Sequence, residues 1–151
     1  MGKSVLILLL VVSLALIAAA PSGAAPDPLG ISNRALGGGQ LNQYTPGVAD
    51  GVGLNNIGLL VRTWGTVTYV DAAQQLFYID DGSGLDDKSG FTGVRVSYKD
   101  LAPGNTFTPP NQGDRVAVTG ISSTTEITLP DLTKRIIPTL RPRRDADKTP
   151  L

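Results

Sequence analysis

The sequence IGLLVRTWGTVTYVDAAQQLFYIDDGSG, residues 57–84, has the pattern of a β-hairpin. β-branched and aromatic side chains fill both halves, as a pleated and half-buried surface favours, and residues 71–75 form a polar turn between them. Because side chains alternate along a strand, the first strand should have two distinct faces. One face should carry Val61, Thr63, Gly65, Val67 and Tyr69, and the other Arg62, Trp64, Thr66 and Thr68.

Gly65 lies in the middle of this first strand. A lone glycine inside a strand usually marks a bulge or a sharp bend. We therefore expect the strand to bend at Gly65 and to pair with neighbours on both sides, as closure of a small barrel requires.

The composition excludes several kinds of chemistry. The 151 residues include 13 basic and 13 acidic side chains, so no overall field attracts nucleic acid or anionic lipid. The absence of cysteine excludes disulfides, lipid-modified cysteine and thiolate chemistry. The absence of histidine removes the commonest general base and metal ligand. We therefore predict a protein that is not an enzyme, with no catalytic residue, metal or cofactor.

The first 24 residues have the layout of a secretory signal peptide. Lys3 gives a positive start, residues 5–17 are almost continuously apolar, and three alanines follow. The apolar run is shorter than the roughly 20 residues that span a bilayer, although an uncleaved anchor is the alternative. The pattern predicts a secreted, periplasmic or cell-envelope protein with no membrane span in the mature chain.

Three more strands are predicted after the hairpin, over residues 93–98, 115–121 and 134–143. No long helical pattern occurs in these segments, so we expect an all-β fold over residues 57–143, a small five-stranded barrel, with a small sandwich as the alternative. The other segments are expected as a flexible Gly/Pro-rich linker or arm (25–56), a proline-rich connection with at most one helical turn (99–112), a polar loop (122–131) and a frayed tail (144–151).

The order of these motifs resembles the oligonucleotide/oligosaccharide-binding (OB) fold, in its nucleic-acid-binding, anticodon-like branch. The matching features are the glycine-bent strand, the Asp-Gly-Ser-Gly corner after residue 80, the Val94–Val96 strand, residues 113–120 and the last strand. The run 54–65 is also similar to one in uncharacterised secreted bacterial proteins. The resemblance implies a five-stranded barrel but no particular ligand, since this fold carries many functions. A proline-rich loop stands where the family has a helix.

OB-folds bind ligands on the outer face of the sheet and between its flanking loops. The outward residues in our alternation combine aromatic rings with arginines, a set suited to stacking on bases or sugar rings. They are Arg62, Trp64, Thr66, Tyr78, Arg95 and Ser97. Arg141, Arg143 and Arg144 add a basic stretch able to meet phosphate or an acidic glycan. The alternative is that Trp64 packs beneath the N-terminal arm and has a purely structural role.

Asp80, Asp81, Asp86 and Asp87 form the densest acidic group of the chain. Clustered carboxylates suit calcium, but the spacing is not that of an EF-hand loop. Turns built from aspartate and glycine are the commoner use of this composition. We therefore interpret the segment as a turn, with calcium as the alternative.

Two hypotheses of function follow. The first is a secreted, non-catalytic binding module that holds a glycan or single-stranded nucleic acid on the Trp64, Tyr78 and Arg95 face. The second is a structural or protein-interaction domain of the cell envelope, with an envelope protein as its partner. The exposure of Trp64 distinguishes them, since an open indole favours the first and a covered one the second.

Overall fold

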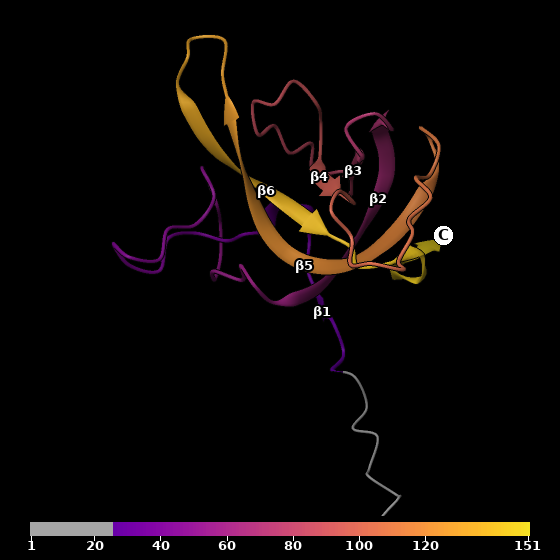
Figure 1. Ribbon diagram of the computed structural model, residues 1–151. Helices are drawn as coiled ribbons and strands as arrows, with labels where there is room; N and C mark the ends of the chain where they lie inside the picture. Colours follow the sequence, from indigo (N-terminus) through magenta and orange to yellow (C-terminus); the bar gives the residue numbers. More distant parts are fainter. Residues whose placement is uncertain (1–25) are drawn as a thin grey trace, which may run out of the picture.

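The computed structural model describes residues 26–151, which form an all-β fold around one mixed seven-stranded sheet (Figure 1). The predicted all-β class is confirmed, but the strand count is seven rather than five. The strands are β1 (Leu29–Gly30), β2 (Leu60–Asp71), β3 (Leu76–Asp80), β4 (Val94–Ser97), β5 (Arg115–Thr128), β6 (Lys134–Arg141) and β7 (Lys148–Pro150). Two three-residue 3₁₀ helices, η1 (Asn33–Ala35) and η2 (Asp145–Asp147), accompany them. The predicted signal peptide lies outside the described residues.

The strands follow the order β1-β2-β3-β4-β6-β5-β7, and β2 also pairs with β5, so the sheet curls into a partly closed ring. β2 runs antiparallel to both β3 and β5. The β1–β2 and β4–β6 pairs are parallel, whereas the remaining pairs are antiparallel. Over residues 26–151, the structure contains no helix long and apolar enough to cross a membrane.

Gly65 lies where β2 changes partners, as the sequence predicts. Residues 60–66 of β2 pair with β5, and residues 66–71 pair with β3, so Thr66 has a partner on each side. A Cβ atom on Gly65 would lie 2.6 Å from the backbone carbonyl carbon and oxygen of Asp80. Only glycine therefore permits the approach of β3 to β2 that closes the ring.

The predicted faces of β2 hold over its first half and fail beyond a bulge. Val61, Thr63 and Val67 are buried, as expected for the inward face. A register shift between Val67 and Tyr69 then reverses the alternation. Val70 packs on the core, and the Tyr69 ring stacks outside it on Phe91, at 3.9 Å between centroids. The inward assignment of Tyr69 is therefore wrong.

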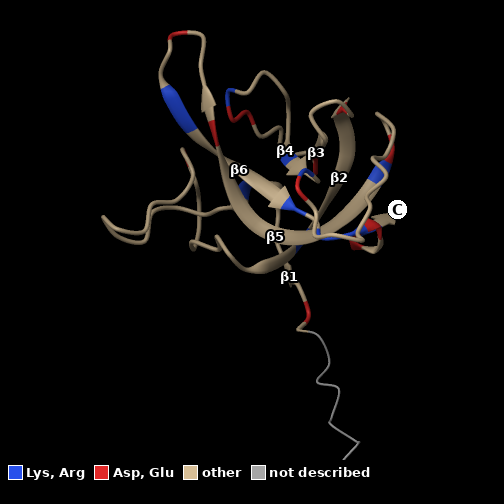
Figure 2. Cartoon of the chain, viewed as in Figure 1, with Lys and Arg blue, Asp and Glu red and all other residues tan. Residues whose placement is uncertain are grey.

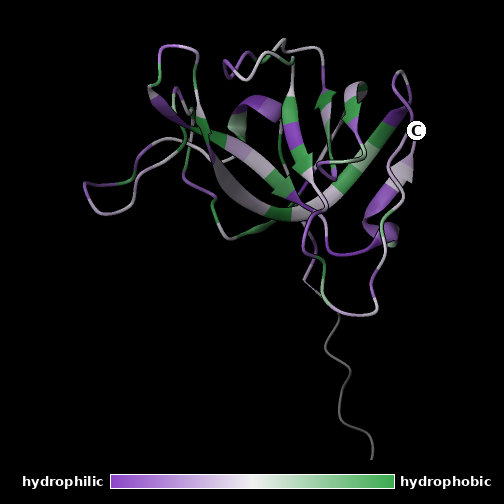
Figure 3. Ribbon diagram, turned by 45° about the horizontal axis from the view of Figure 1, so that its top comes forward, coloured by the Kyte–Doolittle hydropathy of each residue, from purple (hydrophilic) through white to green (hydrophobic). Residues whose placement is uncertain are grey.

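Apolar side chains from the ring strands fill its interior, and the hydropathy colouring shows apolar residues recurring along these strands (Figure 3). Three aromatic rings pack on one another as part of this core. Phe107, from the proline-rich connection, lies 5.1 Å from Tyr98 and 6.0 Å from Phe77 between ring centroids. The connection contains none of the helical turn allowed for near residue 98. Phe107 thus joins the proline-rich connection to the core.

The N-terminal arm is not the loosely packed linker that its composition predicts. Leu36 is fully buried in the core, and Asn33 is buried beside it. Asn33 Nδ2 donates to the carbonyl of Ile79 at 2.8 Å, and the Thr63 hydroxyl donates to Asn33 Oδ1 at 2.7 Å. These bonds fasten η1 to both β2 and β3. They compensate the burial of a polar side chain, so the arm forms part of the fold.

Two further segments are ordered contrary to expectation. Residues 122–128, predicted as a polar loop, continue β5 and pair with β6 in a hairpin that extends beyond the ring (Figure 1). The C-terminal tail, predicted to fray, forms η2 and then β7 along β5. An ion pair between Arg143 and Asp147, 2.9 Å apart, holds the turn before β7. The predicted loop and tail are therefore corrected to sheet structure.

Replacing Gly65 with alanine should destabilise the fold by about 2 kcal/mol or more, because the added methyl group meets backbone that cannot rotate away. Urea unfolding would measure the loss. Gly30→Ala is the matched control, since its Cβ meets nothing within 4 Å and its φ is not positive. Equal stabilities for the two variants would contradict the role of Gly65.

Candidate functional site: the Trp64 cleft

The six predicted binding residues do not form one continuous face. Trp64 and Thr66 line one cleft, and Tyr78 and Arg95 line a second pocket that shares no lining residue with it. Arg62 and Ser97 are half-buried and line neither. The predicted single surface is therefore divided in two.

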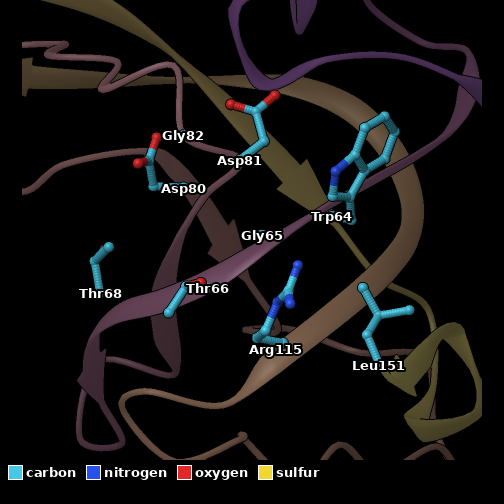
Figure 4. A pocket seen from close by; sticks show the side chains of 9 residues that line it. All are labelled: Trp64, Gly65, Thr66, Thr68, Asp80, Asp81, Gly82, Arg115 and Leu151. Carbon is cyan, nitrogen blue, oxygen red and sulfur yellow. The ribbon is translucent and has the colours of Figure 1, made fainter.

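The Trp64 cleft lies across β2 at Gly65 and encloses about 260 Å³ (Figure 4). Trp64 stands on one side of it with 46% of its surface exposed. The alternative that the arm covers the indole is therefore wrong. β3 and the corner after it, β5, and the residue following β7 supply the rest of the lining. The complete set is Trp64, Gly65, Thr66, Thr68, Asp80, Asp81, Gly82, Arg115 and Leu151.

Two adjacent carboxylates belong to this cleft, and they differ in how they are bonded. Asp81 Oδ2 accepts the backbone N–H of Asn33 at 2.8 Å, and Asp81 Oδ1 accepts that of Ser83 at 3.1 Å. Asp80 Oδ1 accepts from the Gly84 N–H at 3.0 Å. Asp80 Oδ2 accepts no hydrogen bond from any residue in the range 26–151. Both carboxylate oxygens of Asp81 are thus occupied by bonds that stabilise the fold, whereas Oδ2 of Asp80 can still accept a hydrogen bond.

Thr66 joins the two sides of the cleft through strand register. It pairs with Asp80 of β3 on one side and with Arg115 of β5 on the other. Directly paired residues project to the same face, so these three side chains form a row across the outer surface. Arg115 is exposed and makes no ion pair with the part of the chain that the structure describes. Its guanidinium is free to donate.

The second pocket lies under residues 88–91 and beside the β5–β6 hairpin, and encloses about 450 Å³. Tyr78 lines it but is only 1% exposed, since Phe91 packs over it at 5.1 Å between ring centroids. Burial raises the pKa of Tyr78, while the neighbouring Ser89 and Arg95 act in the opposite direction. The prediction that Tyr78 is an exposed stacking residue is therefore wrong.

The other charged residues singled out in the sequence serve local structure. Asp86 pairs with Lys88 at 2.7 Å, and Asp87 is buried with its Oδ1 accepting the Ser89 N–H. Within residues 26–151, no three acidic, histidine or cysteine side chains converge as metal ligands would. In the basic stretch, Arg143 pairs with Asp147 and Arg141 donates to the Lys99 carbonyl. The acidic segment thus forms turns, the interpretation favoured from sequence.

Arg115 is the cleft residue that sequence reasoning missed. It lies at the first position of β5, and the sequence alone does not show that this position pairs with Thr66. Asp80 and Asp81 were interpreted as turn residues, with calcium binding as the alternative, and not as part of the binding face. The feature of the sequence that could have indicated Arg115 and the two aspartates is the bend at Gly65. This bend brings the end of β3 and the start of β5 to the same part of β2.

Comparison with protein-family models, curated proteins and solved structures finds no match. The function of the cleft must therefore be argued from its own chemistry.

The ionised carboxylate of Asp81 should stabilise the fold in a pH-dependent way. Burial acts to raise its pKa, but bonds from Ser83 and the Asn33 N–H prevail and lower it. This contribution should be present above the unfolded-state pKa of about 3.9 and lost as pH falls through the lower folded value. Wild type should exceed Asp81→Asn in urea stability at about pH 7, and the gap should narrow below about pH 4. A pH-independent gap would contradict this role.

Proposed function

We propose that this protein is a non-catalytic binding module that holds an extended polymer, a glycan or single-stranded nucleic acid, with Trp64 as the main contact. The proposal includes a secreted or cell-envelope location, which rests on the signal-peptide pattern of residues 1–24. It does not include Tyr78 as a contact, because that side chain is buried.

The strand order supports an OB-type barrel as the scaffold of this module. The ring β2-β3-β4-β6-β5 returns to β2, with β4 and β6 parallel and the other ring pairs antiparallel. A ring of five strands in which one strand pairs with two neighbours fits the five-stranded, partly open barrel of the OB-fold. β1 and β7 are then additions at the strand edges.

The exposure of Trp64 is the observation that carries the proposal. The indole lies on the wall of a cleft with 46% of its surface exposed, beside polar side chains from β3 and β5. Ligand sites commonly combine an apolar or aromatic wall with a few placed polar groups. Ring stacking on an aromatic side chain contributes about 1–3 kcal/mol per base and does not depend on base identity. Sugar rings present a similar flat surface. Trp64 is therefore well placed to bind one unit of a polymer chain.

Binding without catalysis is the better proposal for the same cleft. The whole sequence lacks histidine and cysteine, so a reaction would depend on the two carboxylates. Asp81 has both oxygens bonded to backbone N–H groups and a lowered pKa. These features oppose the protonation that a general acid needs near neutral pH.

Replacing Trp64 with alanine should reduce polymer affinity by about tenfold or more, since loss of one stacking contact removes about 1–3 kcal/mol. Isothermal titration calorimetry against glycan and oligonucleotide chains would measure it, with urea unfolding to check the fold. Tyr44→Ala is the matched control, because Tyr44 is an exposed aromatic residue outside the cleft. Unchanged affinity in a folded Trp64→Ala protein would refute the proposal.

A second candidate function is supported by a different surface. Residues 39–55 form a lobe at the side of the ring, closed by hydrogen bonds such as Gly39 N to the Gly53 carbonyl at 3.1 Å. The lobe exposes Leu41, Tyr44 and Leu54, the last two by 85% and 86%. It carries almost no charge (Figure 2). An uncharged apolar surface supports the alternative of a domain that docks an envelope protein.

This alternative predicts a captured partner whose binding depends on the lobe. Tyr44→Asp and Leu54→Asp should abolish capture of a specific protein from an envelope extract, because each places a charge in an apolar interface. Trp64→Ala should leave capture intact. Capture that survives both lobe substitutions, or that requires Trp64, would count against this function.

A further inference from the structure

We propose that the Trp64 cleft binds an uncharged sugar ring of a neutral glycan chain, and that it discriminates against phosphate and carboxylate polymers. This inference rests on the proposed binding function and adds to it the class of ligand. It follows from the polar groups that surround the indole and from their charges.

The shape of the cleft suits a flat ring. Trp64 and Thr66 project from the same face of β2, two positions apart, and Gly65 between them contributes no side chain. Figure 4 shows the indole on one side of the cleft, with the carboxylates and Arg115 arranged around Gly65. A flat ring lying on the indole would have its edge directed toward these polar groups. The cleft volume of about 260 Å³ suits one ring rather than a large folded ligand.

The polar groups of the cleft offer both hydrogen-bond donors and hydrogen-bond acceptors. The edge of a neutral sugar ring carries hydroxyl groups, each of which is both a donor and an acceptor. The row across the outer surface provides complementary groups, with Asp80 Oδ2 as an acceptor and the Arg115 guanidinium as a donor. Thr66 lies between them and offers a hydroxyl of its own. Adjacent hydroxyls on one ring can therefore be bound together, and hydrogen bonds to charged groups are the stronger kind.

The charges of the cleft favour a neutral ligand. The cleft contains two carboxylates, Asp80 and Asp81, and one guanidinium, that of Arg115. The pKa of Asp81 is lowered, so it is ionised at neutral pH. Strong binding of nucleic acid normally relies on Lys and Arg contacts to phosphate, and this cleft has an excess of negative charge. A phosphate or uronate would meet repulsion that a neutral hydroxyl does not.

The Asp80→Asn substitution distinguishes binding of a neutral glycan from binding of a charged polymer. The asparagine oxygen can still accept the Gly84 N–H, while an amide nitrogen, which only donates, replaces the other carboxylate oxygen and one negative charge is lost. The wild-type protein should bind at least one of cellohexaose, maltohexaose and chitohexaose, and should bind hexagalacturonate and the oligonucleotide dT10 at least tenfold more weakly. Asp80→Asn should lower the affinity for the neutral glycan by about tenfold or more. Arg115→Ala should also lower this affinity. Asp86→Asn makes the same change outside the cleft and should have no effect.

Calorimetry with these five probes gives distinguishable outcomes. Trp64-dependent binding of a neutral hexasaccharide that falls in Asp80→Asn supports the inference. Trp64-dependent binding of dT10 or hexagalacturonate that equals or exceeds the neutral glycans, and strengthens in Asp80→Asn, overturns it while the proposed binding function stands. Absence of Trp64-dependent binding by every probe overturns both. Urea unfolding of each variant verifies that these differences arise in a folded protein.

Discussion

The structure depends on the close approach of β3 to β2 at Gly65. One strand, β2, must pair with β5 along its first half and with β3 along its second half, and the change of partner occurs within a single residue. The Asp80 backbone occupies the space that any side chain at position 65 would need. The partly closed ring, the burial of its apolar interior and the position of β5 all require that β2 be shared in this way.

The same constraint builds the candidate site. Because Thr66 has a partner on each side, the end of β3 and the start of β5 meet beside the exposed indole of Trp64. Closure of the ring therefore places a carboxylate, a hydroxyl and a guanidinium in one row. The bonds that Asp81 accepts from Asn33 and Ser83 hold the corner of the cleft in place. A binding role for the cleft thus requires no element beyond those that the fold already needs.

Local patterns in the sequence predicted the parts of the structure that depend on local physics. Alternation placed Val61, Thr63 and Val67 inside, and the lone Gly65 indicated the bend. The errors arose where distant segments decide the outcome. Tyr69 changed face because of a bulge against β3, and Tyr78 is buried because the Phe91 ring packs over it. Residues 122–128 look like a loop in composition, yet pairing with β6 makes them a strand.

The candidate site also combines residues that local patterns predict with residues that only tertiary structure reveals. Trp64 and Thr66 were predicted as outward-facing from alternation alone, whereas Arg115 depended on strand register that no local pattern contains. The division of the predicted face into two pockets with no common lining residue also depended on tertiary structure.

The fluorescence of Trp64, the single tryptophan of the chain, reports directly on whether the indole is an open binding surface. If Trp64 binds a sugar ring, acrylamide should quench the free protein strongly, and a neutral hexasaccharide, but not dT10, should protect the indole and shift its emission. A blue-shifted emission that acrylamide does not quench, and that no polymer changes, would contradict binding at Trp64.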